Sequence, residues 1–223
     1  MDKRLLGILA LIAAVFIGIA VFSGHSKSNG SGSSGSGTQP TNHVEGGGSS
    51  GVTLMEYGDY ECPICEMYYL PLKQVQAKYN DTIYFQFRNL PLVQIHPNAF
   101  AGARAAEAAA LQNKFWQMHD ALYDNQSTWA SSNNPTNYFN QYAQGLGLNL
   151  TKFKQDYSSS QVNNLINADL AAFNKTGQDE GTPTFFLDGK YIANTELVDA
   201  NGQPSVDKFS KVIDAEIASK TKQ

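Results

Sequence analysis

The spacing of apolar side chains predicts two strands near the start of the folded part of the chain. In residues 82–88, an isoleucine and two phenylalanines alternate with polar side chains, which is the period of a half-buried strand. Residues 51–59 carry another apolar run, which a Gly-Asp pair ends. Between them we expect a helix over residues 62–79, with Pro63 in its first turn, where proline is tolerated.

Helical periodicity dominates the middle of the chain, from about residue 96 to residue 177. An alanine-rich segment is followed by segments in which aromatic and aliphatic side chains recur three or four positions apart. We expect Trp116 and Trp129 to lie in a core or along a groove, and His96 and His119 to be packing or capping residues. The expected helices cover residues 99–111, 115–123, 135–145, 150–157 and 162–174.

The last part of the chain returns to strands. Residues 184–187 form a short apolar run, an Asp-Gly pair predicts a hairpin turn, and residues 190–193 form the returning strand. Ser205 is expected to cap a final helix over residues 206–220. This order of elements predicts an α/β fold with one mixed sheet, into which the long helical stretch is inserted.

The first residues of the chain differ in character from the rest. Residues 5–22 are an apolar run that follows Asp2, Lys3 and Arg4. The run is long enough to span a membrane. The positive residues before it favour an orientation in which its N-terminal end lies in the cytoplasm. A cleaved signal peptide is the alternative, but its apolar region is normally about 7–15 residues long. We therefore expect a single-pass anchor in the cell membrane and a flexible Gly/Ser-rich linker over residues 23–41, with the catalytic part outside the cytoplasm.

Charge and cysteine content narrow the possible functions. The net charge is −4, and no basic block follows the first few residues, which argues against nucleic-acid binding. The chain has two cysteines, Cys62 and Cys65. A bridge between them closes too small a loop to stabilise a fold, so we expect its value to be chemical.

The position of the two cysteines at a helix start predicts thiol–disulfide chemistry. Residues three apart lie on one helix face, within reach of a disulfide. Unpaired N–H groups and the helix dipole should stabilise a thiolate at Cys62 and lower its pKa. Cys62 is then the exposed sulfur that attacks or is attacked, and the more buried Cys65 resolves the mixed disulfide. The nearby acids Asp59, Glu61 and Glu66 should limit how far the pKa of Cys62 is lowered.

The two alternatives for this cysteine pair are a zinc site and a non-enzymatic binding module. Two thiolates fill half of a zinc site, and the remaining ligand candidates His96 and His119 lie in different predicted helices. We therefore expect no metal, and no cofactor. The second alternative is a non-enzymatic binding module, in which the disulfide is incidental.

Four stretches of the sequence together resemble one family. They are residues 43–46, residues 52–65 with the Cys-Pro-Ile-Cys motif, residues 115–123 and residues 181–190. In this order they resemble the DsbA-like thiol–disulfide oxidoreductases of the thioredoxin superfamily, from about His43 to the C-terminus. A Cys-x-x-Cys pair alone is only moderately specific, whereas the combination is strongly so.

The resemblance implies a thioredoxin fold with an inserted α-helical domain. The N-terminal membrane anchor or uncleaved signal and the linker would precede it. The expected parts are residues 1–22 (anchor or signal), 23–41 (linker), 42–90 (first thioredoxin part), 91–177 (helical insertion) and 178–223 (second thioredoxin part).

The resemblance also assigns site residues. Pro183 is expected to be cis and to face the disulfide, which would expose the backbone of Thr182 to a substrate strand. Glu56 takes the position of a buried acid that tunes the resolving cysteine and relays its proton. No lysine partner for Glu56 is visible on the strand over residues 82–88.

The residues between the cysteines are expected to complete the substrate-binding set. They are Pro63 and Ile64. The strongest oxidants of the family have a histidine where this chain has Ile64, and isoleucine cannot help to hold a thiolate. We therefore expect a less oxidising disulfide than theirs.

The implied function is that of an oxidase in the bacterial cell envelope. It would introduce disulfide bonds into exported proteins through Cys62 and Cys65. A disulfide isomerase or reductase on the same fold is the alternative. Expected partners are reduced exported proteins and, for reoxidation, a membrane quinone reductase of the DsbB or vitamin-K-epoxide-reductase type. Isomerases of the superfamily usually carry a separate dimerisation domain, and this chain has only the linker there, which argues against an isomerase. We expect a monomer.

Overall fold

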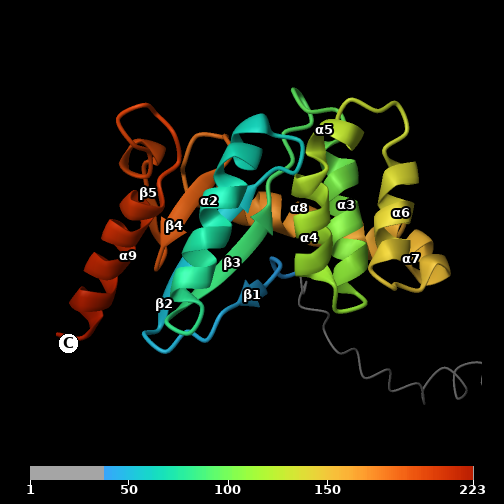
Figure 1. The fold of residues 1–223 in the computed structure, drawn as a ribbon. Helices are drawn as coiled ribbons and strands as arrows, with labels where there is room; N and C mark the ends of the chain where they lie inside the picture. The colour runs from blue at the N-terminus through green and yellow to red at the C-terminus, as the bar shows by residue number, and fades with distance from the viewer. Residues whose placement is uncertain (1–37, 223) are drawn as a thin grey trace, which may run out of the picture. The chain divides into compact units, whose positions relative to one another are not determined.

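A five-stranded mixed sheet forms the centre of the protein (Figure 1). The computed structural model describes residues 38–222. The strands lie in the order β1-β3-β2-β4-β5. β2 and β3 are parallel, and the other neighbours are antiparallel. The strands are β1 (His43–Glu45), β2 (Val52–Gly58), β3 (Ile83–Asn89), β4 (Thr184–Leu187) and β5 (Lys190–Ile192).

Helices follow the predicted order closely. Each helix expected from the sequence is present, with ends that differ by at most two residues. The sequence did not indicate α5 (Gln126–Trp129) or the short 3-10 turn over Asn194–Glu196. The remaining helices are α2 (Pro63–Tyr79), α3 (Ala99–Ala110), α4 (Phe115–Asp124), α6 (Thr136–Gly145), α7 (Leu150–Tyr157), α8 (Ser160–Asn174) and α9 (Val206–Lys220).

The two faces of the sheet are covered by different helices. On one face, α2 and α9 bury an apolar cluster that includes Leu54, Val75 and Phe209. On the other face, Phe173 of α8 packs against Tyr57 of β2. Neighbouring side chains of β2 therefore point to opposite layers, as the two-residue period of a strand requires.

The helices inserted between β3 and β4 form a second core beside the sheet (Figure 1). Trp129, Phe139 and Phe153 are completely buried there. The same cluster includes Cys62 and Cys65, so the inserted helices contribute directly to the surroundings of the cysteine pair. The α/β fold class with an inserted helical region is confirmed.

A buried carboxylate joins the inserted helices to the sheet. Asp169 of α8 accepts hydrogen bonds from the backbone N–H and the hydroxyl of Thr41, each at 2.7 Å. It also accepts from the backbone N–H of Asn89 at 3.0 Å. These bonds fix α8 to the end of β3 and to the residues that lead into β1.

The expected location of the protein needs a correction. Within residues 38–222, no helix is long and apolar enough to cross a membrane. The apolar run over residues 5–22, on which the expected single-pass anchor rested, lies outside the described residues. The structure therefore gives no support to a membrane-anchored location. The domain boundaries drawn from the sequence stay a prediction.

Candidate active site

The two cysteines occupy the first turn of α2. Cys62 is the N-cap residue, with the extended torsions φ −70° and ψ 121°, and Pro63 is the first helical residue. Proline fits there because the N–H that it lacks would have no partner in the helix. Cys65 lies one turn further on, and both cysteines are free thiols. The pair therefore combines a sulfur at the helix start with a second one behind it.

Cys62 is less exposed than the sequence led us to expect. Only 4% of Cys62 and 1% of Cys65 are accessible to solvent, so the prediction of an exposed Cys62 was wrong in degree. The buried cluster around Cys62 includes residues of the inserted helical region. The side-chain amide of Gln126, on α5, donates to the carbonyl oxygens of Cys62 at 2.9 Å and of Tyr60 at 3.0 Å.

The loop before β4 closes the other side of the site. The Thr182–Pro183 peptide bond is cis, as expected. The Sγ atom of Cys62 lies 3.5 Å from the carbonyl oxygen of Thr182. Asn194 donates to the carbonyl of Pro183 at 2.9 Å, which holds the loop in place. The structure thus brings the cysteine pair and the Thr182–Pro183 loop together, while their roles toward a substrate stay predictions.

Local hydrogen bonds lower the pKa of Cys62 to about 6. The largest cause is the hydrogen bond from the Cys65 thiol, and burial opposes it. The Thr182 side chain and the backbone N–H groups of Cys65 and Ile64 lower the pKa further. The Thr182 hydroxyl is buried without a partner among the described residues, so it is free to turn toward a thiolate. The direction matches the expectation from the helix start.

The pKa of the second thiol is shifted the other way. Burial raises the pKa of Cys65 well above its usual range, and the neighbouring Cys62 and Glu56 add to the rise. The two thiols are therefore unequal: Cys62 ionises easily and Cys65 does not. Such a pair places the negative charge on one known sulfur.

Two of the three acids beside the motif are engaged in hydrogen bonds. Asp59 accepts hydrogen bonds from the N–H of Leu92 at 3.0 Å, and its carboxylate lies 2.7 Å from Nδ1 of His96. Glu61 accepts from the backbone N–H of Asn98. Both carboxylates are thus engaged by the segment between β3 and α3, and neither is among the causes that shift the pKa of Cys62.

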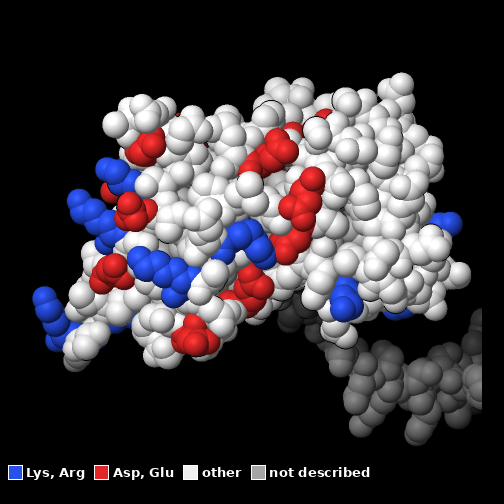
Figure 2. All heavy atoms as spheres, viewed as in Figure 1, with Lys and Arg blue, Asp and Glu red and all other residues white. Residues whose placement is uncertain are grey.

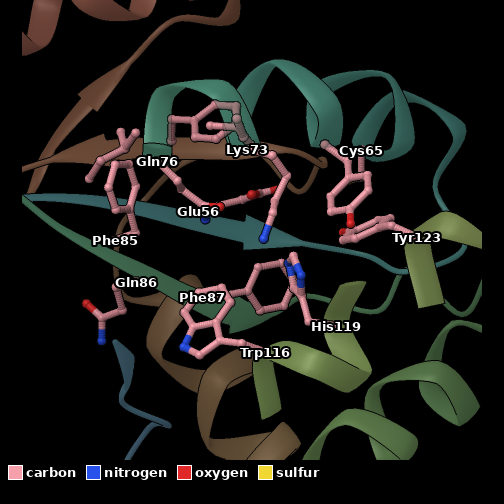
Figure 3. A pocket seen from close by; sticks show the side chains of 14 residues that line it. Glu56, Cys65, Lys73, Gln76, Phe85, Gln86, Phe87, Trp116, His119 and Tyr123 are labelled. Carbon is pink, nitrogen blue, oxygen red and sulfur yellow. The ribbon is translucent and has the colours of Figure 1, made fainter. Parts of the chain in front are cut away.

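Glu56 lies beneath the cysteine pair, on the β2 face that α2 covers. Burial raises its pKa to about 8, and the charge of Cys62 adds to this. On β3 the residue paired with Glu56 is Phe87, so the strand provides no cation. The carboxyl group lines a cavity instead, between α2, α4 and the sheet (Figure 3).

This cavity is small, with a volume of about 20 Å³. It contains both apolar walls and several polar groups. Figure 3 shows Glu56, the Lys73 side chain and Tyr123 turned toward the same space below Cys65. The lining residues are Leu54, Glu56, Cys65, Tyr69, Leu72, Lys73, Gln76, Phe85, Gln86, Phe87, Trp116, His119, Tyr123 and Phe185.

Sequence reasoning missed two residues of this site. Lys73 was overlooked because a cation was sought on β3, although it follows Cys65 by two helical turns and therefore shares its face. Gln126 had no recognisable signal, because its contact with Cys62 joins residues 64 positions apart.

The structure also locates the other residues that the sequence analysis named. Ile64 is 45% exposed and Pro63 is also exposed, so both border the open side of the cysteines. Trp129 is buried in the helical core, and Trp116 lines the cavity. His119 is buried, and burial lowers its pKa. Within residues 38–222, no group of three or more metal-ligating side chains is present.

Comparison with known proteins identifies the family. A family model described as Thioredoxin matches residues 38–215. The chain belongs to the thioredoxin family. A thioredoxin-like oxidoreductase from Silicibacter pomeroyi DSS-3 has a similar structure, with a TM-score of 0.64 and 22% identity, over 80% of this chain and 93% of that one.

Two further solved structures have the fold of this thioredoxin-family chain. DsbA1 of Wolbachia pipientis gives a TM-score of 0.66 at 20% identity, covering 82% of this chain and 94% of that one. Oxidised BdbD from Bacillus subtilis gives 0.65 at 21% identity, covering 81% and 96%. Identities this low show a similar fold and no more.

Curated sequence relatives include much longer proteins. A Na(+)/H(+) antiporter NhaA 1 of Mycolicibacterium gilvum is 37% identical over 151 residues, which is 66% of this chain and 23% of that protein. A protein with the same name from Mycolicibacterium vanbaalenii is 37% identical over 150 residues, with the same shares. This thioredoxin-family chain therefore spans about a quarter of the length of these relatives.

Proposed function

We propose that this protein is a thiol–disulfide oxidase that introduces disulfide bonds into exported proteins. The observation that carries this proposal is the contrast between the two thiols, with the pKa of Cys62 lowered to about 6 and that of Cys65 raised. A stabilised Cys62 thiolate stabilises the reduced enzyme. The disulfide of such an enzyme is therefore easily reduced, and it oxidises other thiols.

In the first step a substrate thiolate attacks the Cys62 sulfur of the enzyme disulfide. A bond forms between the substrate sulfur and Cys62, and the Cys62–Cys65 bond breaks. Cys65 leaves with the electron pair. Because burial disfavours its thiolate, Cys65 needs a proton as it leaves.

Glu56 is placed to supply that proton. With a pKa of about 8, its carboxyl group is mostly protonated at neutral pH, and it lines the same cavity as Cys65. A neutral acid beside a leaving thiolate is the arrangement that general acid catalysis requires. Glu56 then recovers a proton from solvent before the next cycle.

In the second step another thiolate of the substrate attacks its own sulfur in the mixed disulfide. The substrate leaves with a disulfide, and Cys62 departs as a thiolate, which its low pKa favours. In this direction the substrate resolves the mixed disulfide, and Cys65 resolves it only in the reverse reaction. The role expected for Cys65 from the sequence is corrected accordingly.

The reduced enzyme must return its two electrons to an acceptor. We propose a membrane quinone reductase of the DsbB or vitamin-K-epoxide-reductase type as that acceptor. Reduced exported proteins would reach the exposed border formed by Pro63 and Ile64, and would pair with the Thr182 backbone.

A glutathione redox titration of the purified protein tests this proposal. An oxidase is expected to have a reduction potential well above about −200 mV, and a thioredoxin-like reductase a potential near about −270 mV. A value in the lower range would replace the oxidase by the reductase alternative. An isomerase would instead reshuffle a scrambled disulfide substrate without added oxidant.

A Cys62→Ser variant separates the oxidase from a non-enzymatic binding module. The variant is expected to lose oxidation of a dithiol peptide completely, because no sulfur remains to be attacked. Full activity in this variant would leave the cysteine pair without a catalytic role.

A further inference from the structure

The peptide group between Gly58 and Asp59 lies directly beside the second cysteine sulfur. Its N–H, which belongs to Asp59, donates to Sγ of Cys65 at 3.5 Å. Only 1% of Asp59 and 1% of Cys65 are accessible to solvent, so water does not compete for this hydrogen bond. The contact joins the end of β2 to the first turn of α2.

The direction of this N–H is fixed from the other side of the same peptide group. The carbonyl oxygen of Gly58 accepts the N–H of Leu90, just after β3, at 2.8 Å. In a trans peptide the C=O and the N–H point in opposite directions, so the bond to Leu90 aims the N–H of Asp59 at Cys65. A Cβ atom on Gly58 would lie 2.5 Å from Cε2 of Phe87, so a larger residue there would displace the peptide group.

The rest of Asp59 is also held firmly. Its carboxylate is fully buried, and it accepts the N–H of Glu61 at 2.8 Å in addition to its bonds with the segment between β3 and α3. Its carbonyl oxygen accepts the N–H of Cys62 at 3.1 Å and the hydroxyl of Tyr123 at 3.4 Å. The N–H of Asp59 is therefore a preorganised donor, which needs no rearrangement to bind a charged sulfur.

A negative charge on Cys65 has few other stabilising contacts. Among residues 38–222, burial, Cys62 and Glu56 raise the pKa of Cys65, whereas the backbone N–H of Asp59 lowers it. No cation is among these groups. Figure 2 shows acidic side chains beside the upper part of α2 on this face, with basic side chains further down. The donor that favours a Cys65 thiolate therefore lies inside the protein.

We propose that the N–H of Asp59 stabilises the negative charge that develops on the Cys65 sulfur during disulfide exchange, and that the buried Asp59 carboxylate positions this N–H. The inference rests on the proposed thiol–disulfide chemistry and deepens it. It gives a catalytic contact to a residue that the sequence analysis treated only as a nearby negative charge.

The contact is needed in both directions of the exchange. When a substrate thiolate bonds to Cys62, the Cys62–Cys65 bond breaks and Cys65 takes the electron pair. The N–H of Asp59 holds this charge until the proton from Glu56 arrives. In reverse, Cys65 gives up its proton and attacks Cys62, and the substrate leaves as a thiolate. Cys65 is neutral at both ends, so the hydrogen bond gains strength in the transition state and changes the rate but not the equilibrium.

Replacing the Asp59 amide by an ester removes this N–H and keeps the side chain. A synthetic segment of residues 1–61 that contains the ester can be ligated to recombinant residues 62–223, because the second segment begins with the native Cys62. In the protein with glutathione joined to Cys62, we expect the ester to slow glutathione release by Cys65 about tenfold. The reduction potential should stay unchanged.

An ester at Thr53 is the matched control. Thr53 also lies on β2, and its N–H donates to Oδ1 of Asp188 at 2.8 Å, so a comparable hydrogen bond is lost away from the cysteines. This ester should lower stability to a similar extent and leave glutathione release unchanged. Attack by a second glutathione on the mixed disulfide, with Cys62 as the leaving group, should have the same rate in all three proteins, because Cys65 takes no part in it.

Asp59→Asn tests the carboxylate while the N–H stays in place. An amide has one acceptor oxygen instead of two, so it cannot serve the donors on both sides of the carboxylate. We expect glutathione release to slow by a smaller factor than in the Asp59 ester, again at an unchanged reduction potential.

Three results would overturn the inference. They are unchanged glutathione release in the Asp59 ester, equal slowing in the Thr53 ester, and a wild-type rate in Asp59→Asn. The oxidase proposal fails separately, on a low reduction potential of the wild type, whatever rates the variants have.

Discussion

The Sγ atom of Cys62 lies 3.5 Å from the carbonyl oxygen of Thr182, a residue 120 positions further along the chain. The contact joins the start of α2 to the loop that precedes β4. β2 and β4 are neighbours in the sheet, and their antiparallel pairing brings these two ends together. The reactive sulfur is therefore positioned by the sheet as well as by its own helix.

The low pKa of Cys62 depends first on Cys65. We expect the ultraviolet absorbance of the thiolate in the reduced protein to titrate with a midpoint near 6. In Cys65→Ala the midpoint should rise by about one unit or more, because the largest stabilising hydrogen bond is lost. An unchanged midpoint would show that the helix start alone holds the thiolate.

The buried acid should make stability depend on pH. The pKa of Glu56 is raised from 4.5 to about 8, so its contribution to stability is full below pH 4.5 and is lost as the pH rises through 8. Between pH 4.5 and pH 8, the free energy of unfolding of the oxidised wild type should fall by about 3 kcal/mol relative to that of Glu56→Gln. This allows for partial access of solvent through the cavity.

Urea unfolding of both oxidised proteins at the two pH values measures this difference. The oxidised form is used because it has no Cys62 thiolate to titrate in the same range. Equal stability differences at both pH values would mean that Glu56 ionises normally in the folded protein.

Gln126 should be important for stability although it takes no part in the chemistry. Gln126→Ala leaves the buried carbonyl of Tyr60 without its donor and removes one of the two donors to the carbonyl of Cys62, which still accepts from the Glu66 N–H. We expect a loss of about 2–3 kcal/mol in the free energy of unfolding. The exposed Gln117 on α4 gives a matched control, for which Gln117→Ala should change it by less than about 0.5 kcal/mol. Similar losses in the two variants would contradict this role.

Substitution of Asp169, whose carboxylate joins α8 to the sheet, should be among the most destabilising. Asp169→Ala removes the acceptor of the Thr41 and Asn89 hydrogen bonds, and we expect it to cost more than about 3 kcal/mol in chemical denaturation. Asp156→Ala removes a carboxylate from a surface ion pair with Lys152, and should cost less than about 1 kcal/mol. A small effect at Asp169 would mean that apolar packing alone holds α8.

Local patterns were sufficient for most of the fold. Each strand except β1, and each helix of more than one turn, follows from apolar spacing, turn residues or a cap, such as Ser205, which accepts from the N–H of Lys208 at the start of α9. The short α5 was missed because four residues are too few to show a period. Cys62 is buried in a cluster with residues of the inserted helices, which lie far along the chain, and its low solvent exposure was therefore missed as well.

From the residues themselves, the site was predictable only where it is local, and the family resemblance added the cis Thr182–Pro183 bond. Cys62 at a helix start, and the lowering of its pKa, follow from neighbouring residues. The hydrogen bonds of the acids beside the motif do not, because Asp59 and Glu61 are bonded to a segment 37 positions further along the chain. Lys73 shares a helical face with Cys65, but only the tertiary structure shows that α4 provides its partner Asp120.

The N-cap position of Cys62 has a consequence for repeated turnover. Its carbonyl already accepts the hydrogen bond of the Glu66 N–H, and its own N–H is bonded to Asp59 outside the helix. In the proposed mechanism, making and breaking bonds at the Cys62 sulfur therefore breaks no backbone hydrogen bond of α2. The sulfur would change its bonding partner in each cycle while the helix that carries it keeps the same conformation.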